Sequence, residues 1–419
     1  MGLCFLDLFA GAGGLSEGFI RAGYEPIAHV EMDNAASFTL KTRAAFHWLK
    51  GTDQLSIYYD YLTGKISRDS LYDAIPKEIL DTVINKEIGE SSLKDIFTQI
   101  NKALKNRKLD LIIGGPPCQA YSLVGRSSDK NKMLEDSRCY LFRYYIQFLK
   151  KYRPKYFVFE NVLGLLSAKD SQGNKYFDEM QEAFRQAGYQ ISYKLIAADE
   201  YGIPQKRQRI IIIGRRGKTV FSFPQLLKTE LTASISELLQ DLPKLNAGEG
   251  SILGNTIYQY GKCSALNTMN IAAPGAPITL HCSRPQKDFD LEIYHYVADI
   301  WRTKKIRVPY DMLPTHLKTR TNTTCFKDRY KVVAGEEKAC HTIIAHIAKD
   351  GHYYIHPDVV QNRSLTPREA ARIQTFPDDY FFETVSGIPG RGPAFKQIGN
   401  AVPVLLAEQI AKKLLEVWK

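Results

Sequence analysis

A cysteine in a stiff loop is the first residue that could do chemistry. Cys118 lies in GGPPCQAYS, residues 114–122, directly after the apolar run LDLIIGG. The two prolines before it fix backbone φ angles, and a thiol is nucleophilic even when only a small fraction is ionised. Free cysteines most often do nothing more than pack, but the residues that follow this one are polar. The pattern therefore indicates a thiol presented for covalent catalysis.

A glycine-rich turn near the N-terminus is the second candidate. In LDLFAGAGGLSEGF, Gly11, Gly13 and Gly14 lie where an apolar strand gives way to a helix, and a backbone without Cβ atoms lets a ligand approach closely. Glu31 ends the next apolar run, where an acidic residue of a dinucleotide site accepts ribose hydroxyls. The spacing is not strict G-x-G-x-x-G, and no phosphate-loop Lys-Ser or Lys-Thr follows. The turn predicts a nucleoside-containing ligand: NAD, FAD or S-adenosylmethionine.

Polar side chains also stand beside two later apolar runs. In KYFVFENV, Glu160 and Asn161 end a predicted strand, where a carboxylate either caps a helix or faces a ligand. In GIPQKRQRIIII, Gln205, Arg207 and Arg209 alternate, so their side chains are expected on one face of the chain. Ligands of open α/β sheets bind beyond the carboxyl ends of the strands. We therefore expect the thiol, the carboxyl and the guanidinium groups to face one crevice.

The apolar runs predict the sheet that positions these groups. CFLDLFAG, EPIAHVE, LDLIIGG, YFVFENV and RIIIIGR are separated by helical stretches such as RCYLFRYYIQFLKKY and FDEMQEAFRQAG. Strands without polar alternation, with helices between them, are typical of a sheet covered on both faces. The predicted fold class is α/β, with a doubly wound, mostly parallel, Rossmann-like sheet.

A change of composition predicts a second, smaller and irregular domain. Glycine, proline and threonine become frequent over 244–362, and the apolar runs shorten. The helical pattern then returns in TPREAARIQTF, so we expect 363–419 to rejoin the first domain, 1–243. Within that first domain, 52–108 is expected to form a polar helical insertion.

The net charge and the spacing of the cysteines limit which partners and ligands we expect. The formal net charge of +11 favours a polyanionic partner, and the densest charge lies in 302–331, where nine Lys or Arg accompany two Asp. Such a stretch is either a solvated face or a phosphate-contacting surface, and we favour the second. Seven scattered cysteines without C-x-x-C, and the adjacent pairs His281-Cys282 and Cys340-His341, argue against a metal site. Without a signal peptide or a membrane span, a soluble cytoplasmic protein is expected.

Six motifs in order resemble the DNA (cytosine-5) methyltransferases: DLFAGAGG, GGPPCQAYS, ENV, QKRQR, TPREAARIQTFP and QIGNAVP. The resemblance covers the chain from Leu3 onward, apart from 52–108 and 244–362. It implies an S-adenosylmethionine-dependent methyltransferase fold, S-adenosyl-L-methionine as the methyl donor, S-adenosyl-L-homocysteine as the product and duplex DNA as the substrate. The region 244–362 resembles the family's target-recognition domain.

The resemblance also implies roles for single residues. Cys118 resembles the nucleophile, Glu160 the carboxylate that holds the target base, and Arg207 and Arg209 the paired arginines. Glu31 resembles the residue that binds the ribose hydroxyls. The other expected cofactor contacts are Phe9, Ala10, Gly11, Gly13, Gly14, Met32, Asp95 at the adenine amino group, Ile96, Pro116, Leu141, Asn400 and Ala401, and the other expected substrate contacts are Gln119, Ser122 and Gln205.

Cytosine chemistry explains why these groups would be needed together. Carbon 5 is too electron-poor to attack a methyl sulfonium until a thiolate adds to carbon 6. The charge that then develops on N3 and O2 is stabilised by a carboxyl and a guanidinium, roles that fit Glu160 and Arg209. Arg207 is expected to support Glu160 or a phosphate. The base that removes the carbon 5 proton stays unassigned, and the cytosine must be flipped out of the duplex at a cost of a few kcal/mol.

Other functions stay open at this point. An RNA (tRNA) cytosine-5 methyltransferase would share the scaffold, but the size of 244–362 favours a duplex reader. A non-catalytic DNA-binding relative would need a damaged motif, and a Rossmann oxidoreductase would bind NAD. We expect a bacterial restriction-modification enzyme, associated with the nucleoid through DNA and acting as a monomer. A cognate restriction endonuclease would act on the same site without forming a stable complex with this protein. The target sequence cannot be read from the chain, because no general code relates side chains to bases.

Overall fold

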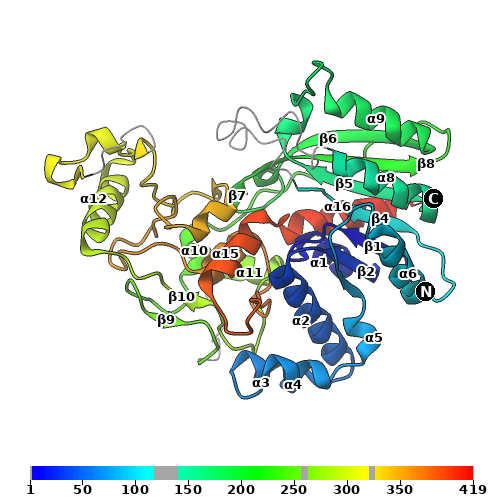
Figure 1. The fold of residues 1–419 in the computed structure, drawn as a ribbon. Coiled ribbons are helices and arrows are strands. Elements are labelled where there is room, and N and C mark those ends of the chain that lie inside the picture. The colour runs from blue at the N-terminus through cyan, green and yellow to red at the C-terminus, as the bar shows by residue number, and fades with distance from the viewer. Residues whose placement is uncertain (1, 118–139, 256–262, 320–325, 419) are drawn as a thin grey trace.

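A seven-stranded sheet forms the centre of the computed structural model, in the order β3-β2-β1-β4-β5-β8-β6 (Figure 1). The structure describes residues 2–117, 140–255, 263–319 and 326–418. The strands of this sheet are β1 (Cys4–Leu8), β2 (Glu25–Glu31), β3 (Val83–Asn85), β4 (Leu111–Gly114), β5 (Tyr156–Asn161), β6 (Tyr189–Ala197) and β8 (Gln208–Arg216).

The direction of the strands determines which residues meet at one edge. Strands β1 to β5 pair in parallel, whereas β8 runs antiparallel between β5 and β6. The mostly parallel α/β sheet predicted from the sequence is thus confirmed. Because β8 is reversed, its first residues lie beside the last residues of β5, with Asn161 opposite Ile210. The amino end of β8 therefore joins the carboxyl ends of the parallel strands.

Helices cover both faces of the sheet. On one face, α1 (Gly14–Arg21) and α16 (Val404–Glu416) pack on a buried cluster that includes Phe5, Val158 and Ile211. On the other face, α6 (Leu93–Leu104), α8 (Leu141–Tyr152) and α9 (Tyr176–Gln186) cover a second cluster that includes Leu6 and Phe157. Successive strand residues enter opposite clusters, which explains why the strands read as unalternated apolar runs.

The expected insertion over 52–108 is wrong for its second half. The helices α3 (Leu55–Leu62), α4 (Arg68–Asp73) and α5 (Lys77–Leu80) lie outside the sheet and contact α2 (Asn34–Gly51). By contrast, β3 pairs with β2 and α6 contacts β2, so residues 83–104 belong to the central fold. The sequence pattern did not indicate that these residues belong to the central fold, because β3 has only three residues and α6 buries a single apolar stripe.

The rest of the described chain has two-residue strands and mostly short helices, with the 17-residue α12 (Asp288–Lys304) as the exception. Two-stranded ribbons join β7 to β11 in parallel and β9 to β10 in antiparallel orientation. Within the described residues, no helix is long and apolar enough to cross a bilayer. The bounds are β7 (Gln205–Lys206), β9 (Gly250–Ser251), β10 (His281–Cys282), β11 (Cys340–His341), α10 (Ile235–Leu239), α11 (Ser264–Thr268), α12 (Asp288–Lys304), α14 (Pro367–Ile373), α15 (Arg391–Asn400) and the 3₁₀ segments η4 (Leu163–Leu166), η5 (Ala198–Glu200), η6 (Tyr310–Met312), η7 (Thr315–Leu317) and η8 (Ala345–Ala348).

The region 244–362 divides into two packing groups. One cluster, drawn from residues 293–355, has its own core around Tyr294 and Tyr330. Figure 1 shows α12, which contributes to this cluster, at the end of the molecule away from the sheet. Most of the other buried apolar residues of the region join a larger cluster with residues 45–75 and 370–404. Part of the predicted second domain therefore shares its core with the first.

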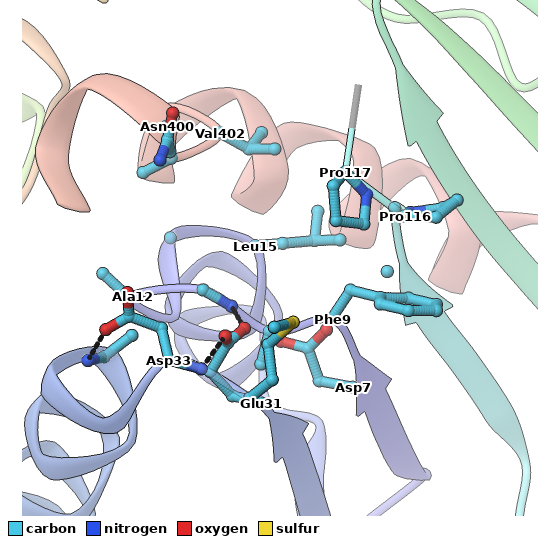
Figure 2. A pocket seen from close by; sticks show the side chains of 18 of the residues that line it. Asp7, Phe9, Ala12, Leu15, Glu31, Asp33, Pro116, Pro117, Asn400 and Val402 are labelled. Carbon is cyan, nitrogen blue, oxygen red and sulfur yellow. Dashed lines mark hydrogen bonds between the residues drawn. The ribbon is translucent and has the colours of Figure 1, made fainter. Parts of the chain in front are cut away.

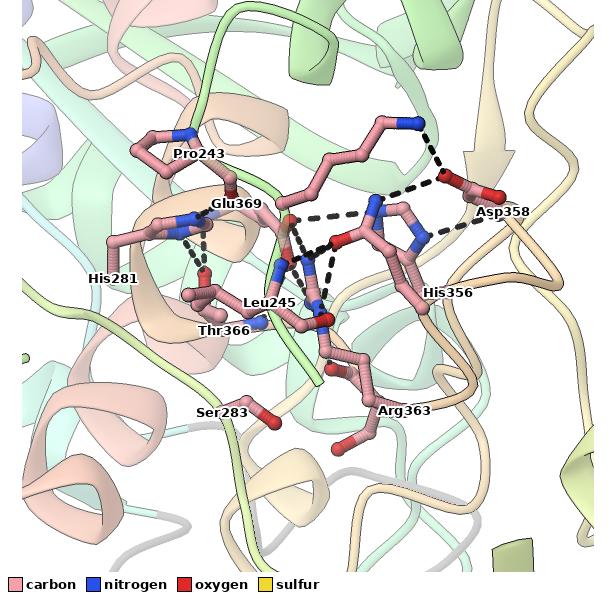
Figure 3. A network of polar contacts seen from close by, with 12 residues as sticks. Pro243, Leu245, His281, Ser283, His356, Asp358, Arg363, Thr366 and Glu369 are labelled. Atoms are coloured by element: carbon pink, nitrogen blue, oxygen red, sulfur yellow. Dashed lines mark hydrogen bonds and ion pairs between the residues drawn. The ribbon is translucent and has the colours of Figure 1, made fainter. Parts of the chain in front are cut away.

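A buried polar network ties the start of α14 to the region before it (Figure 3). Arg363 donates to both carboxylate oxygens of Glu369, at 2.8 and 2.7 Å. Burial would raise the pKa of Glu369, but the charge of Arg363 outweighs it and holds the pKa well below its ordinary value. His281 contacts the Thr366 hydroxyl at 3.1 Å and the Pro243 carbonyl at 2.7 Å. The network fixes α14, and with it the C-terminal segment, against residues 243–281.

Candidate active site

A cavity of about 320 Å³ lies at the carboxyl edge of the sheet, where the strand ends of β1, β2, β4 and β5 meet (Figure 2). Residues far apart in the sequence form its wall, so this edge gathers most of the predicted site. The predicted site residues in the wall are Phe9, Ala10, Gly11, Gly14, Glu31, Met32, Pro116, Leu141, Glu160, Arg209, Asn400 and Ala401.

The glycine loop is shaped by contacts behind it. Gly13 has a φ of +80°, in the left-handed region that favours glycine. A Cβ atom on Gly13 would lie 2.8 Å from side-chain atoms of both Leu40 and Tyr380. The Tyr380 hydroxyl donates to the Ala12 carbonyl at 2.6 Å. Gly13 is not among the lining residues, so it supports the turn from behind while Gly11 faces the cavity.

The Glu31 carboxylate is oriented by the backbone. Gly11 N donates to Oε2 and Asp33 N donates to Oε1, each at 2.7 Å (Figure 2). Burial raises the pKa of Glu31. Each carboxylate oxygen keeps a further lone pair that can accept from a hydroxyl group. A buried, fixed acceptor in the cavity wall is what ribose recognition requires.

Asp7 is a lining residue that the sequence analysis did not single out. Its Oδ2 accepts from the Ser16 hydroxyl at 2.8 Å, while the buried Oδ1 has no hydrogen-bond partner among the described residues. Burial raises the pKa of Asp7 to about 8, and the charge of Glu31 adds to the effect. The first position of the motif DLFAGAGG could have indicated it, since Asp7 interrupts an otherwise apolar strand. A polar ligand atom in the cavity could satisfy Oδ1.

Glu160 and Arg209 form an ion pair in the cavity wall. Arg209 Nε lies 2.7 Å from Glu160 Oε1, and the two side chains are only 14% and 15% exposed. The neighbouring Asn161 donates from Nδ2 to the Pro116 carbonyl at 3.2 Å and accepts from Val162 N at 2.9 Å. Asn161 therefore ties the loop after β4 to the end of β5. A carboxylate and a guanidinium are held together beside the start of the predicted nucleophile loop.

Three predicted residues of that loop, Cys118, Gln119 and Ser122, lie outside the described residues. Pro116 and Pro117, the last described residues before Cys118, both line the cavity. The roles of the three residues stay predictions.

The expectation that Gln205, Arg207 and Arg209 share one face is wrong. Strand β7 ends at Lys206 and β8 begins at Gln208, so the alternation is interrupted at Arg207. Arg209 lines the cavity, whereas Gln205 and Arg207 are not among its lining residues. Gln205 is buried without measurable exposure, and Arg207 is 1% exposed. The two residues face the interior, where they contact other segments of the chain.

Asp95 and Ile96 also lie away from the cavity. Asp95 is half exposed on α6 and forms an ion pair with Lys86 at 2.9 Å, and Ile96 is buried beneath the helix in the sheet core. The residues that directly follow β3, Lys86, Glu87 and Ile88, line the cavity instead. The strand end precedes the motif-like LKDI by several residues, which is why the sequence pattern pointed to the wrong pair.

The two histidine-cysteine pairs are explained by protein contacts. His281 bonds within the network of Figure 3, and His341 Nε2 lies 2.5 Å from the Tyr353 carbonyl. Burial lowers the pKa of both histidines to about 4. In the part of the chain that the structure describes, no group of three His, Cys, Asp or Glu is placed to hold a metal ion.

Comparison with known proteins gives the family. The model of the C-5 cytosine-specific DNA methylases matches residues 3–67 and 70–416. The chain belongs to this family. The Type II methyltransferase M.Bpa9945I of Bacillus paralicheniformis is 38% identical over 449 residues, covering 98% of each chain. The Type II methyltransferase M.DdeI of Desulfomicrobium norvegicum is 30% identical, covering 98% of this chain and 88% of its own.

The fold is shared with solved methyltransferases. The crystal structure described as a DNA modification methyltransferase from an Escherichia coli prophage aligns with a TM-score of 0.62 at 21% identity, covering 100% of this chain and 99% of the other. Membership of the C-5 cytosine-specific DNA methylases makes this protein an enzyme that acts on DNA and implies S-adenosylmethionine as the methyl donor. The sequence-based recognition of the family is confirmed, and the RNA-directed, non-catalytic and oxidoreductase alternatives are not favoured.

Proposed function

We propose that this cytosine-5 DNA methyltransferase modifies one cytosine of a specific duplex sequence through a covalent Cys118 adduct on a flipped-out base. The observation that carries the proposal is the Glu160–Arg209 ion pair, because it stands in the wall of the same cavity as the glycine loop and Glu31. One cavity thus offers a nucleoside-binding end and a pair of charged groups next to the predicted nucleophile loop.

The cofactor end fits S-adenosylmethionine through this chain's own groups. Glu31 would accept from the ribose hydroxyls, since it lines the cavity and backbone N–H groups hold both of its carboxylate oxygens. We assign Glu87 and Ile88, rather than Asp95 and Ile96, to the adenine side, because they follow β3 and line the cavity. Asn400, at the end of α15, would close the wall on the other side.

The base end fits cytosine activation. The Cys118 sulfur would bond to carbon 6, and the ring electrons would move toward carbon 5 and onto N3 and O2. The Glu160 carboxyl would hold N3 and the Arg209 guanidinium would hold O2, where the charge develops. Carbon 5 then takes the methyl group from the sulfonium, which leaves as a thioether. Loss of the carbon 5 proton expels the sulfur and restores the aromatic ring.

The basic stretch 302–331 is proposed to contact DNA phosphates. Some of its cations are already neutralised: Arg302 pairs with Asp299 at 2.7 Å, and Lys305 pairs with Glu336 at 2.7 Å. The exposed cations of the stretch that form no ion pair with another described residue are Lys304, Arg307, Lys318 and Lys327. We assign phosphate contact to these four, and affinity for duplex DNA should fall steeply with salt.

The names of the relatives support a proposal for the biological setting. Both relatives described above are named Type II methyltransferases, which supports a bacterial restriction-modification system with a cognate endonuclease acting on the same site. We propose that the enzyme acts as a monomer on DNA, in the cytoplasm at the nucleoid.

Methyl transfer from labelled S-adenosylmethionine to duplex DNA and to tRNA, assayed in parallel, tests the function. We expect label in DNA alone, with bisulfite mapping of the product placing it at one cytosine of one recurring sequence. Incorporation into tRNA alone, or into cytosines without a common sequence, would contradict the proposal. The Glu160→Gln variant is the matched control, because it keeps the side-chain size while removing the carboxylate.

A further inference from the structure

A hydrogen-bonded relay runs behind the cavity. Gln205 Nε2 donates to Gln374 Oε1 at 2.7 Å. Gln374 Nε2 in turn donates to the Ile398 carbonyl at 2.7 Å and to the Ala401 carbonyl at 3.4 Å. Both glutamine side chains are buried without measurable exposure. Two amides buried this deeply are stable only because their donors and acceptors are paired.

The relay ends at the C-terminus of α15, on the Ile398 carbonyl, which also accepts from Ala401 N at 3.2 Å, and on the carbonyl of the capping residue Ala401. Arg207 reinforces the same place, since Nη1 and Nη2 each lie 3.4 Å from the Gly399 carbonyl. A cation at a helix C-terminus is also favoured by the helix dipole. Side chains from β7 and the end of α14 therefore fix the turn from which Asn400 enters the cavity wall.

The other end of the relay holds the segment that follows β11. Ile343 N donates to Gln205 Oε1 at 3.2 Å, and the Ile343 carbonyl accepts from Arg207 Nη1 at 2.9 Å. Helix α15 packs tightly on η8 here, because a Cβ atom on Gly399 would lie 2.2 Å from Ala345 N. Gln205, acting through Gln374, and Arg207 thus connect the end of α15 to a segment of the predicted recognition region.

We propose that Gln205 and Gln374 are positioning residues that fix the wall 400–402 of the cofactor cavity to the segment 343–348. This inference rests on the proposed cofactor site. Without the relay, the carbonyls at the end of α15 lose their buried donors and the wall shifts. Because the groups proposed to act on the base come from the loop after β4, from β5 and from β8, loss of the relay weakens cofactor binding more than it slows the chemical step.

The test compares Gln374→Leu, Gln205→Leu and the double variant by calorimetric titration with S-adenosylhomocysteine. We expect each single change to raise the Kd about tenfold, with a smaller fall in kcat at saturating substrates. The Kd of the double variant should rise by less than the product of the two single increases, since both changes break the same relay. The control is Gln409→Leu, which also removes an amide donor to a backbone carbonyl, that of Tyr201 at 2.9 Å, on a helix face away from the cavity.

Unchanged binding in Gln374→Leu, or an equal loss in Gln409→Leu at a matched melting temperature, would overturn the proposal. If the leucine variants do not fold, Arg207→Lys provides the same comparison, because it keeps the charge and loses the two-nitrogen contact with Gly399. Glu31→Ala separates the two hypotheses. If that variant binds normally, the proposed cofactor site fails; if it loses binding while Gln374→Leu does not, only the relay fails.

Discussion

The cavity edge of the sheet and the region 244–362 are built on different principles. Glu31, Glu160 and Arg209 stand at the ends of strands that are buried on both faces. In the region 244–362, the described strands have two residues each, and loops, 3₁₀ turns and the helices α11 and α12 join them. Groups that must hold a reacting ring need rigid supports, whereas a surface that selects a sequence can be carried by loops.

The hydrophobic cores show the same division. The buried residues of the cluster around Tyr294 and Tyr330 lie within 293–355, and the partly buried side chains packed on it lie within 289–359, so we expect changes there to leave the sheet unaffected. By contrast, η8 packs against α15, which borders the cavity, and Arg207 bonds to both the Ile343 and the Gly399 carbonyls. Chemistry and recognition should therefore separate in experiments, except where the Gln205 relay connects them.

Removal of the thiol should have the largest effect. Cys118→Ser keeps the shape of the loop but weakens the nucleophile, so methyl transfer should fall by at least about 10⁴-fold. Duplex binding, measured by fluorescence anisotropy at fixed salt, should stay within about threefold of the wild type. Near-normal turnover of the variant would remove Cys118 from the mechanism.

Exchange of 244–362 with the corresponding region of a relative should change which DNA sequence is methylated without changing the methyl-transfer reaction. We expect the chimera to modify a new site and to lose the original one by at least about a thousandfold, because several base contacts change at once. Sequencing of the bisulfite-treated product measures both the gain of the new site and the loss of the original one. A chimera that keeps the original target would show that recognition resides elsewhere.

Substitution of the two arginines of QKRQR should have different effects on kcat. Arg209→Lys keeps a cation in the wall but loses the Nε contact with Glu160, so kcat should fall about a hundredfold. Arg207→Lys should lower kcat much less and instead weaken S-adenosylhomocysteine binding. Steady-state kinetics at saturating DNA distinguish the two, and equal losses of kcat would contradict the division of roles.

Substitution of two carboxylates tests which residues form the wall of the cofactor cavity. Glu31→Ala should raise the KM for S-adenosylmethionine about tenfold or more, because it removes a buried acceptor from the cavity. Asp95→Ala should leave it unchanged, because Asp95 lies on the surface of α6 beside Lys86. A comparable rise in both variants would restore Asp95 to the site.

The last expected effect, on stability rather than on activity, concerns Asp7 and pH. Its pKa in the fold is about 8, against an ordinary value of 3.8, so the folded state holds the proton more tightly than the unfolded state. The stability from that proton is present below about pH 4 and is lost as the pH rises toward about 8. Asp7→Asn removes the titration, so its melting temperature should rise relative to the wild type between these pH values. A difference that is constant with pH would contradict the assignment.

The sequence predicted the parts of the site that follow from local patterns. Gly11 and Glu31 were found because glycines and an acid at the ends of apolar runs mark one sheet edge. Arg207 and Asp95 were misplaced because their positions depend on a break between two strands and on where a three-residue strand ends. The relay from Gln205 to Gln374 joins residues far apart in the chain, and no spacing rule indicates it.

The most direct test of the account is the covalent adduct. A duplex that carries 5-fluorocytosine at the mapped target is incubated with the enzyme and S-adenosylmethionine, because fluorine at carbon 5 blocks release of the sulfur. We predict a stable complex whose digest, read by mass spectrometry, contains one modified peptide with the nucleotide on Cys118, and no complex for Cys118→Ser. The absence of an adduct from an active preparation, or its attachment to another residue, would contradict the account.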